Sequence, residues 1–504
     1  MTHNRRQFLT TVAASAFCLS APAFVRRGAW ASGASPALHL PVIDATASGA
    51  FEIAATAGET EFVTGATSPT LGFNRPYLGP VIRVRPGSEV AASVVNRLDV
   101  PISVHWHGLL VSGELDGGPH QQIAPGAAWR PRLPIDQSPA TLWYHTHIHG
   151  ETAPRVYAGL AGVLIVDDGN DADRGLPSTF GVDDLVLLLQ DKRFDASGAA
   201  VYRPGDADLM HGFLGEAVVV NGRIGPRFAV PRGLVRLRLV NGANARNFDL
   251  SFSDGRPFAL VATDQGLLSK PLPLSRIRLT PGERIELLVD FGSGGEATLV
   301  SAPHAETGGT MAMGGMMHDM LPLPETFTAP FPVAAFAVDP SAPVAVRTAP
   351  TSLDVPDVPP PSPVATRRFV LNDMGAMMGG MGGGMGHGGH GAASTMAFGI
   401  NGQPFDMSRL DAEAALGTAE RWFVSGEMMG HPFHIHGARF RVLSENGGSP
   451  RAENAGWKDT VFVEGEAELL VRFDHPATDA NPLMLHCHIL EHEDLGMMGQ
   501  FTVS

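Results

Sequence analysis

Short apolar runs separated by polar and turn-forming residues recur along the whole chain. Residues 81–84, 235–240 and 469–473 are runs of this kind, rich in Val, Ile and Leu. Such runs between Gly and Pro turns predict β-strands, because β-branched side chains fit a pleated surface while Gly and Pro favour turns. The pattern therefore predicts an all-β protein made of sandwich strands.

A weak internal repeat indicates three similar domains. Three segments have related sequences, in which a Gly-containing turn leads into an apolar run. They are residues 85–96, 231–241 and 417–426. Acidic residues 167–173 and proline-rich residues 350–363 mark two boundaries. We expect domains at residues 40–167, 180–345 and 366–504, with a proline-rich linker at residues 346–365.

Composition and charge narrow the class of protein. With 44% hydrophobic and 17% charged residues, the chain of 504 residues is long and apolar enough for several cores. A formal net charge of −15 disfavours nucleic acid and anionic lipid as partners and suits cations. Two cysteines exclude a disulfide-built scaffold. No segment has the continuous apolar length that a membrane span requires, so we expect none.

The N-terminus predicts export. Arg5 and Arg6, followed by an apolar run to Leu19, are typical of a twin-arginine signal, which we expect to occupy residues 1–31. Small-residue cleavage patterns end at Ala23 and at Ala31, and the second lies closer to the first expected domain. Export would remove Cys18 and leave Cys487 as the one cysteine of a periplasmic monomer that uses the twin-arginine (Tat) machinery.

The candidate metal ligands lie in four short motifs. On a strand, residues i and i+2 share a face, so each His-x-His presents two imidazoles to one side. One such pair is weak evidence for a metal, but four pairs in one chain predict a site for several metals. The motifs are His105-Trp-His107, His145-Thr-His147, His431-Pro-Phe-His434-Ile-His436 and His486-Cys487-His488, with His492 and Met497 downstream.

Cys487 carries the most specific signal. Strand alternation sends its side chain to the opposite face from its two neighbours, so one tripeptide would serve two metal sites. A thiolate, two imidazoles and a distant thioether form the ligand set of a blue-copper centre, and His431, His492 and Met497 complete it. Structural zinc is the competing interpretation, but it prefers two to four cysteines.

The repeat provides an internal comparison. In the first domain Thr146 stands where Cys487 stands, and Leu160 stands where Met497 stands. That domain would keep an imidazole pair but lacks a blue centre. The second domain has no histidine pair after Asn241, so we expect it to be copper-free and to act as a spacer.

With all four motifs present in order, the sequence resembles the three-domain multicopper oxidases over essentially the whole chain that follows the signal. The resemblance implies three cupredoxin-like Greek-key β-sandwich domains and four copper ions, namely one type 1, one type 2 and a type 3 pair. By motif position, the type 1 copper would take His431, Cys487, His492 and Met497; the type 2 copper His105 and His434; and the type 3 pair His107, His145, His147, His436, His486 and His488.

Within the family, the chain looks most like the bacterial periplasmic copper efflux (cuprous) oxidases and bacterial laccases. The last motif continues through Glu491, Glu493 and Asp494 to Met497, and a Met- and His-rich insert occupies residues 374–396. The resemblance implies oxidation of Cu(I) at the type 1 copper, passage of electrons through Cys487, and reduction of O2 to water, for copper detoxification and resistance. A second Met-rich stretch lies at residues 311–320.

Several further residues are candidates by their position in the family pattern. Asp116 and Glu493 would relay protons. The alternatives are that Asp116 is only a turn residue, as Asp116-Gly-Gly-Pro is typical of turns, and that Glu493 is only a solvated carboxylate. A substrate copper would bind near the type 1 site, where thioethers suit Cu(I). The candidates for that site are Asp373, Met374, Glu427 and Met429.

Three other functions compete with a cuprous oxidase. A laccase would oxidise phenols or aromatic amines, although a Met-rich loop over the blue site argues against bulky substrates. A non-catalytic copper-binding envelope protein would share the fold, but relatives of that kind lack the ligands. A copper nitrite reductase would need no type 3 pair and normally has two domains.

Overall fold

The computed structural model describes residues 35–303, 329–343, 346–353, 355, 361–372, 398–427 and 429–504. About 48% of the described residues are strand and 6% helix, so the all-β prediction is confirmed. The predicted signal at residues 1–31, the insert at residues 374–396 and the Met-rich stretch at residues 311–320 lie outside the described residues. Within the described residues, no helix has the length and apolar character needed to cross a membrane.

Two sheets, here called the first unit, enclose a core of residues between Ala45 and Val166. Strand β6 shows why they face each other, because its buried positions alternate with less buried ones. One sheet has the order β2 (Val42–Asp44), β5 (Val81–Val84), β10 (Ala161–Val166) and β9 (Ala140–His145). The other has the order β4 (Ala66–Phe73), β3 (Ala50–Val63), β6 (Glu89–Asn96) and β7 (Ala128–Trp129), with β8 (Arg132–Pro134) also on β6.

The second unit encloses a core of residues between Leu185 and Phe336. One sheet has the order β1 (Ser35–Pro36), β15 (Pro226–Val230), β23 (Phe331–Val338), β22 (Glu296–Ser301), β17 (Phe248–Phe252) and β20 (Ile277–Leu279). The other has the order β14 (Arg223–Ile224), β13 (Ala217–Val220), β11 (Asp184–Phe194), β16 (Leu234–Asn241), β21 (Arg284–Asp290), β18 (Phe258–Thr263) and β19 (Gly266–Leu274), with β12 (Ala200–Val201) on β11.

The third unit encloses a core that is built mainly from residues between Phe369 and Val503. One sheet has the order β25 (Gly399–Ile400), β24 (Ala365–Asn372), β27 (Ala419–Gly426), β31 (Glu466–Arg472) and β29 (Arg439–Glu445). The other has the order β26 (Ala412–Ala414), β33 (Met498–Val503), β32 (Leu483–Cys487), β28 (His431–Ile435) and β30 (Thr460–Val463). The domain boundaries given above stay a prediction.

Strand β10 shows how the first and second units are joined. All six of its residues are buried, because both faces of the strand are covered. Leu164 packs into the core of the first unit, whereas Val163 and Ile165 pack against Val186 and Val240 of the second unit. A strand with two covered faces loses the alternation of apolar and polar residues, as in β10. The two units therefore share a continuous apolar interface.

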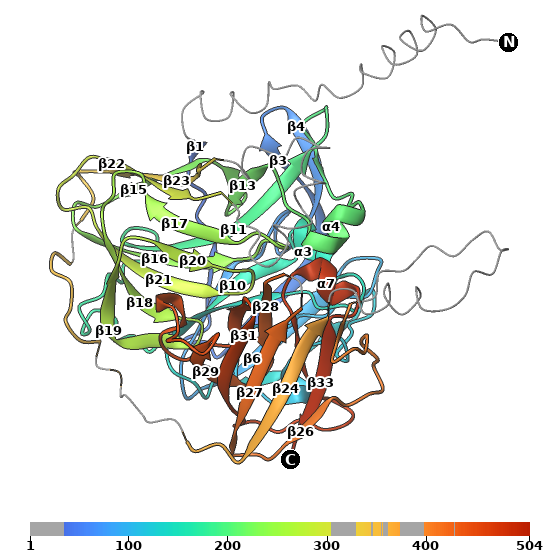
Figure 1. Ribbon diagram of the computed structural model, residues 1–504. Helices are drawn as coiled ribbons and strands as arrows, with labels where there is room; N and C mark the ends of the chain where they lie inside the picture. Colours follow the sequence, from blue (N-terminus) through green and yellow to red (C-terminus); the bar gives the residue numbers. More distant parts are fainter. Residues whose placement is uncertain are drawn as a thin grey trace, which may run out of the picture.

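Short helices gather where the units meet. In the part of the chain that the structure describes, the helices are α3 (Thr152–Ala158), α4 (Asp206–His211), α7 (Leu490–Asp494) and the 3-10 turns η1 (Gly113–Leu115) and η4 (Ala452–Asn454). Both α3 and α4 contact α7, and Figure 1 shows the three helices side by side. The Asp494 carboxylate accepts hydrogen bonds from the backbone N–H groups of Thr152 and Ala153 at 2.9 and 2.8 Å, and so caps α3.

A buried lysine in β11 makes stability depend on pH. The Lys192 ammonium donates to the Tyr157 carbonyl and lies 3.9 Å from the Tyr157 ring centroid, and burial lowers the Lys192 pKa to about 7. Since the unfolded chain keeps this proton up to a pKa of about 10.5, the charge destabilises the fold fully below about pH 7 and less at higher pH. Lys192→Met should therefore raise the free energy of unfolding by about 2–3 kcal/mol more at about pH 6 than at about pH 9.

Urea unfolding of the wild type and the variant at both pH values tests this expectation. Lys270→Met, which removes an exposed lysine of β19, serves as the control and should show no such difference between the two pH values. An equal stability change for Lys192→Met at both pH values would contradict the expected neutralisation of Lys192.

Candidate metal centre

Strands β28 and β32 present their side chains to two different sites. They pair antiparallel, with Phe433 opposite Cys487 and His434 opposite His486. Phe433 and Cys487 point into the core of the third unit, so His434 and His486 point to the other face of the sheet. One pair of neighbouring strands therefore serves a thiol site on one side and a histidine cluster on the other.

The thiol site joins β28, β32 and α7. The Cys487 sulfur lies 3.4 Å from His431 Nδ1 and 3.7 Å from His492 Nδ1, and all three side chains are fully buried. Their ligand atoms lie close enough together for one metal ion. Met497 is buried in the same core, and its carbonyl accepts the Cys487 N–H at 3.0 Å. A thiolate with two imidazoles is a donor set that suits copper.

The histidine cluster is built from the first and third units. His105 Nε2 lies 3.5 Å from His434 Nε2, and His147 Nε2 lies 3.3 Å from His486 Nε2. His436 Nε2 lies 3.1 Å from His486 Nε2. Backbone hydrogen bonds between His105 and His145, at 2.8 and 3.1 Å, hold the two first-unit motifs side by side. The cluster also contains His107 and His488, whose ring centroids are 5.1 Å apart.

Backbone carbonyls fix how these rings are turned. His105 Nδ1 lies 3.1 Å from the Asp116 carbonyl oxygen, and His434 Nδ1 lies 2.9 Å from the Asp459 carbonyl oxygen. His145 Nδ1 and His486 Nδ1 each lie 2.9 Å from the backbone carbonyl oxygen of the next residue in the chain. A carbonyl accepts only an N–H, so the Nε2 atoms keep their lone pairs for a metal.

Some buried ring nitrogens in the cluster have no hydrogen-bond partner. They are His107 Nδ1, His145 Nε2, His147 Nδ1 and both ring nitrogens of His488. Burial of polar atoms without partners is costly unless another group binds them, and metal ions meet this need. The donor set therefore fits copper ions held by imidazole nitrogen, as the resemblance implies.

The cluster also keeps its histidines neutral. Burial, followed by repulsion from a neighbouring imidazole, holds their pKa values well below 6.5. This applies to His107, His145, His147, His436, His486 and His488. Neutral imidazole is the form that binds a metal, so the site needs no deprotonation near neutral pH.

Two buried carboxyl groups contact different histidines of the cluster. Asp116 Oδ2 lies 2.8 Å from His436 Nδ1 and 3.4 Å from His105 Nδ1. Glu493 Oε1 lies 3.4 Å from His147 Nδ1, and its Oε2 lies 3.3 Å from His486 Nδ1. Burial, together with the charge of Asp494, raises the Glu493 pKa well above its usual value, which favours the protonated carboxyl. Both predicted relay residues therefore lie beside the cluster.

A third buried carboxylate, Asp459, was not anticipated from the sequence. Asp459 Oδ1 lies 3.2 Å from His107 Nε2 and 3.5 Å from His434 Nδ1. The Arg284 guanidinium of the second unit donates to both Asp459 oxygens at 2.6 Å. Burial alone would raise the Asp459 pKa, but Arg284 holds it well below its usual value. The second unit therefore supplies a side chain that binds a carboxylate of the cluster. The predicted role of a spacer did not include such a contact.

The predicted substrate-copper residues are partly described. Glu427 is exposed after the end of β27, and Met429 is half-buried two residues before His431. Both precede His431 by a few residues in the chain. Asp373 and Met374 lie outside the described residues.

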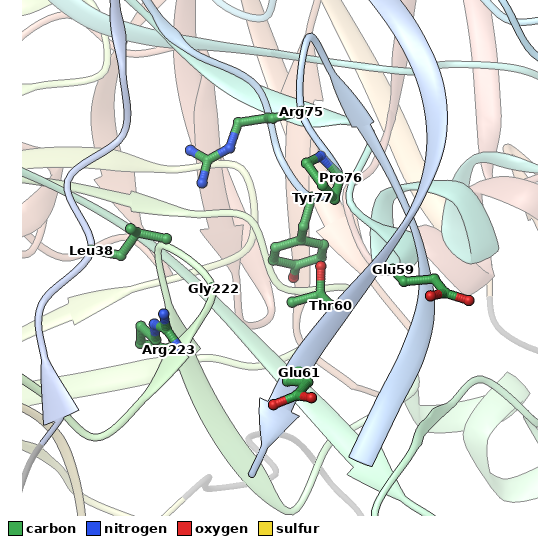
Figure 2. A pocket seen from close by; sticks show the side chains of 9 residues that line it. All are labelled: Leu38, Glu59, Thr60, Glu61, Arg75, Pro76, Tyr77, Gly222 and Arg223. Carbon is green, nitrogen blue, oxygen red and sulfur yellow. The ribbon is translucent and has the colours of Figure 1, made fainter. Parts of the chain in front are cut away.

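A separate hollow of about 290 Å³ opens between the first and second units (Figure 2). Arg75 and Tyr77 of the first unit face Arg223 of the second unit across it. The lining residues are Leu38, Glu59, Thr60, Glu61, Arg75, Pro76, Tyr77, Gly222 and Arg223. None of them is a candidate ligand, so the hollow is distinct from the metal centre.

The chain is similar to known proteins in sequence. Two multicopper oxidase family models match, one at residues 54–171 and one at residues 384–504. The cell division protein FtsP of Edwardsiella tarda is 39% identical over 88% of this chain and 87% of its own length.

Solved structures match over almost the full length. The laccase-like multicopper oxidase CueO of Ochrobactrum sp. is 41% identical with a TM-score of 0.82, over 93% of this chain and 100% of that chain. A multicopper oxidase of Campylobacter jejuni is 28% identical with a TM-score of 0.78, over 93% of this chain and 95% of that chain. The prediction of cupredoxin-like β-sandwiches is thereby confirmed.

Proposed function

This chain belongs to the multicopper oxidase family, and from that premise we propose that it oxidises Cu(I) at a type 1 copper and reduces O2 to water at a trinuclear cluster. The observation that carries the proposal is the position of Cys487 between two sites. Its thiol faces His431 and His492, while its neighbours His486 and His488 belong to the cluster on the other side of the sheet.

We assign the copper ligands by motif and by distance. The type 1 copper takes His431, Cys487, His492 and Met497, and the type 2 copper takes His105 and His434. One type 3 copper takes His147, His436 and His486, whose ligand atoms converge, and the other takes His107, His145 and His488. Copper bound at these ligands supplies the one-electron redox chemistry and the four-electron reduction of O2.

The protein supplies connection and protons. The backbone of residues 486–488 joins the two sites through covalent bonds, which is the shortest path that the fold offers. The raised pKa of Glu493 favours its protonated form, and its carboxyl lies 3.3 Å from His486 Nδ1 and 3.4 Å from His147 Nδ1, beside the cluster. Asp116 accepts a hydrogen bond from His436 Nδ1 at 2.8 Å. O2 reduction consumes protons as well as electrons, and a carboxyl that favours its protonated form beside the cluster suits that demand.

Cu(I) is the reductant that the surroundings favour. Glu427 and Met429 offer a carboxylate and a thioether beside the strand that carries His431, and thioethers prefer Cu(I). The Campylobacter relative is described as a metallo-oxidase. The role we propose is copper detoxification in the periplasm, by a monomer exported through the Tat pathway, as Arg5 and Arg6 indicate.

Two alternatives have a specific observation behind them. The Ochrobactrum relative is described as active towards lignin model compounds and lignosulfonate, which favours a laccase that oxidises phenols. The curated relative named for cell division favours an envelope role without catalysis. Against that role stands the complete set of ten buried histidines and Cys487, which a purely structural protein would not need.

Substrate comparison tests the proposal. Copper-loaded protein should be blue, bind about four copper ions and consume O2 when given Cu(I). In Glu427→Gln/Met429→Leu, kcat/KM for Cu(I) should fall by about tenfold, the effect of losing about 1.4 kcal/mol of binding, while kcat/KM for a phenol should change little. Oxygen uptake with each reductant measures both values.

The control is Glu413→Gln, which removes an exposed carboxylate elsewhere in the third unit. It should leave both rates unchanged. A colourless protein that binds one or two copper ions, or a wild type that consumes no O2 with Cu(I), would refute the proposed function.

A further inference from the structure

The two ring nitrogens of His492 have different partners. Nδ1 lies 3.7 Å from the Cys487 sulfur, and Nε2 lies 3.0 Å from the carbonyl oxygen of Met210. Because a carbonyl oxygen only accepts, Nε2 carries the proton and Nδ1 keeps its lone pair on the side of the thiol. Met210 belongs to α4 of the second unit. A backbone group from one unit thus orients a candidate copper ligand of another.

Protein also covers a face of the same ring. The Phe398 ring stacks on His492 with 4.4 Å between centroids and an angle of 17° between the planes. His492 is fully buried as a result. The outer edge of the imidazole is therefore closed by α4, and one of its faces is closed by Phe398.

Helix α4 is held in place by side chains that do not touch the candidate ligands. The Asp208 carboxylate accepts hydrogen bonds from Arg193 Nη1 and from the Gly205 N–H, both at 2.9 Å. Arg193 also donates to the Leu214 carbonyl at 2.7 Å, which ties the segment after α4 to β11. With six residues and no buried side chain, α4 has little apolar packing of its own. Polar contacts, among them the Arg193–Asp208 pair that joins a side chain of α4 to β11, therefore hold this end of the helix.

The far end of α4 is fixed against α7. Gly212, at φ +86°, leaves no room for a Cβ, which would lie 2.2 Å from Ala245 Cβ and 2.8 Å from Ile489 Cγ2. The next residue, Phe213, donates its N–H to Glu491 Oε2 at 3.0 Å. Glu491 Oε1 also accepts from Tyr202 at 3.0 Å. The segments before and after α4 are thus both hydrogen-bonded to Glu491, the residue that precedes His492.

We propose that α4 is a specificity element of the oxidase, which closes the Nε2 edge of His492 to aromatic reductants. Electron transfer from an aromatic donor slows with distance from the ligand ring, and the Met210 carbonyl occupies the Nε2 edge of His492 where such a donor would come nearest. A Cu(I) ion held at Glu427 and Met429 approaches instead from the side of His431. The inference rests on the proposed function and adds that α4 selects metal ions over phenols.

Loosening α4 tests the closure first without copper. In metal-free protein, diethyl pyrocarbonate should modify His492 slowly, because the ring is fully buried and is held by the Met210 carbonyl and Phe398. Asp208→Ala removes the partner of Arg193 and should raise the rate of His492 modification by about tenfold, as measured by peptide mass spectrometry. Asp206→Ala removes an exposed carboxylate from the same helix and should leave the rate unchanged. Equal modification of His492 in all three proteins would overturn the closure.

The copper-loaded proteins test the consequence. In Asp208→Ala, the ratio of kcat/KM for a methoxyphenol to kcat/KM for Cu(I) should rise by about tenfold, while Asp206→Ala keeps the wild-type ratio. Faster modification of His492 without a change in this ratio would overturn the role in specificity. A wild type that oxidises neither reductant, with the modification rates as expected, would refute the oxidase and leave the closure of His492 standing.

Discussion

Replacing Cys487 with serine is expected to abolish the blue colour and to lower O2 consumption by at least about a thousandfold, as when one member of a catalytic unit is lost. A thiolate is a soft ligand that copper prefers, whereas a serine hydroxyl stays protonated and binds copper weakly. The change also removes the thiol of Cys487, whose chain neighbours His486 and His488 belong to the histidine cluster. Visible absorption and oxygen uptake of copper-loaded protein measure both effects.

The fold should survive this substitution. Serine is slightly smaller, and its oxygen can accept the Ile489 N–H that Cys487 accepts at 3.4 Å. Far-ultraviolet circular dichroism should therefore match that of the wild type. Met498→Leu is the matched control, because it changes a buried side chain next to Met497 and should keep the colour and turnover. Turnover retained in Cys487→Ser would contradict the proposed path.

The parts of the site that follow from strand alternation could be predicted from the sequence. Alternation is a local rule, so His486-Cys487-His488 alone indicates that the thiol and the imidazoles face opposite ways. The structure has this arrangement, with Phe433 opposite Cys487 on the core side and His434 opposite His486 on the cluster side. The all-β class follows for the same reason, since apolar runs and turns are also local signals.

The contacts made by the second unit could not be predicted in this way. Asp459 and Arg284 are 175 residues apart, and neither belongs to a motif whose spacing indicates the other. The partner of His492 is a backbone carbonyl 282 residues away, which leaves no trace in residue identity. The absence of histidine pairs from the second domain indicated a spacer, but counting ligands does not reveal the groups that orient the ligands. Only the packing of α4 and β21 against the third unit reveals them.

The Arg284–Asp459 pair should have the largest effect on stability among the described ion pairs beside the cluster. Both side chains are fully buried, and Asp459 also faces His107 and His434. Arg284→Met would leave a buried carboxylate without its main partner, which typically costs about 3–5 kcal/mol. Nearby Lys458 is bound to Asp264 and Glu283, at 3.0 Å each, so it is not available to replace Arg284.

Urea unfolding of metal-free protein should therefore show a lower midpoint for Arg284→Met. The control is Arg132→Met, which breaks an exposed pair with Glu89 and should cost at most about 1 kcal/mol. In the double variant Arg284→Met/Asp459→Leu, the uncompensated charge is gone, so part of the stability should return. After copper loading, the double variant should hold less copper than the wild type, because His107 and His434 lose the carboxylate that orients them. Full stability in Arg284→Met would show that the second unit joins the cluster by apolar packing alone.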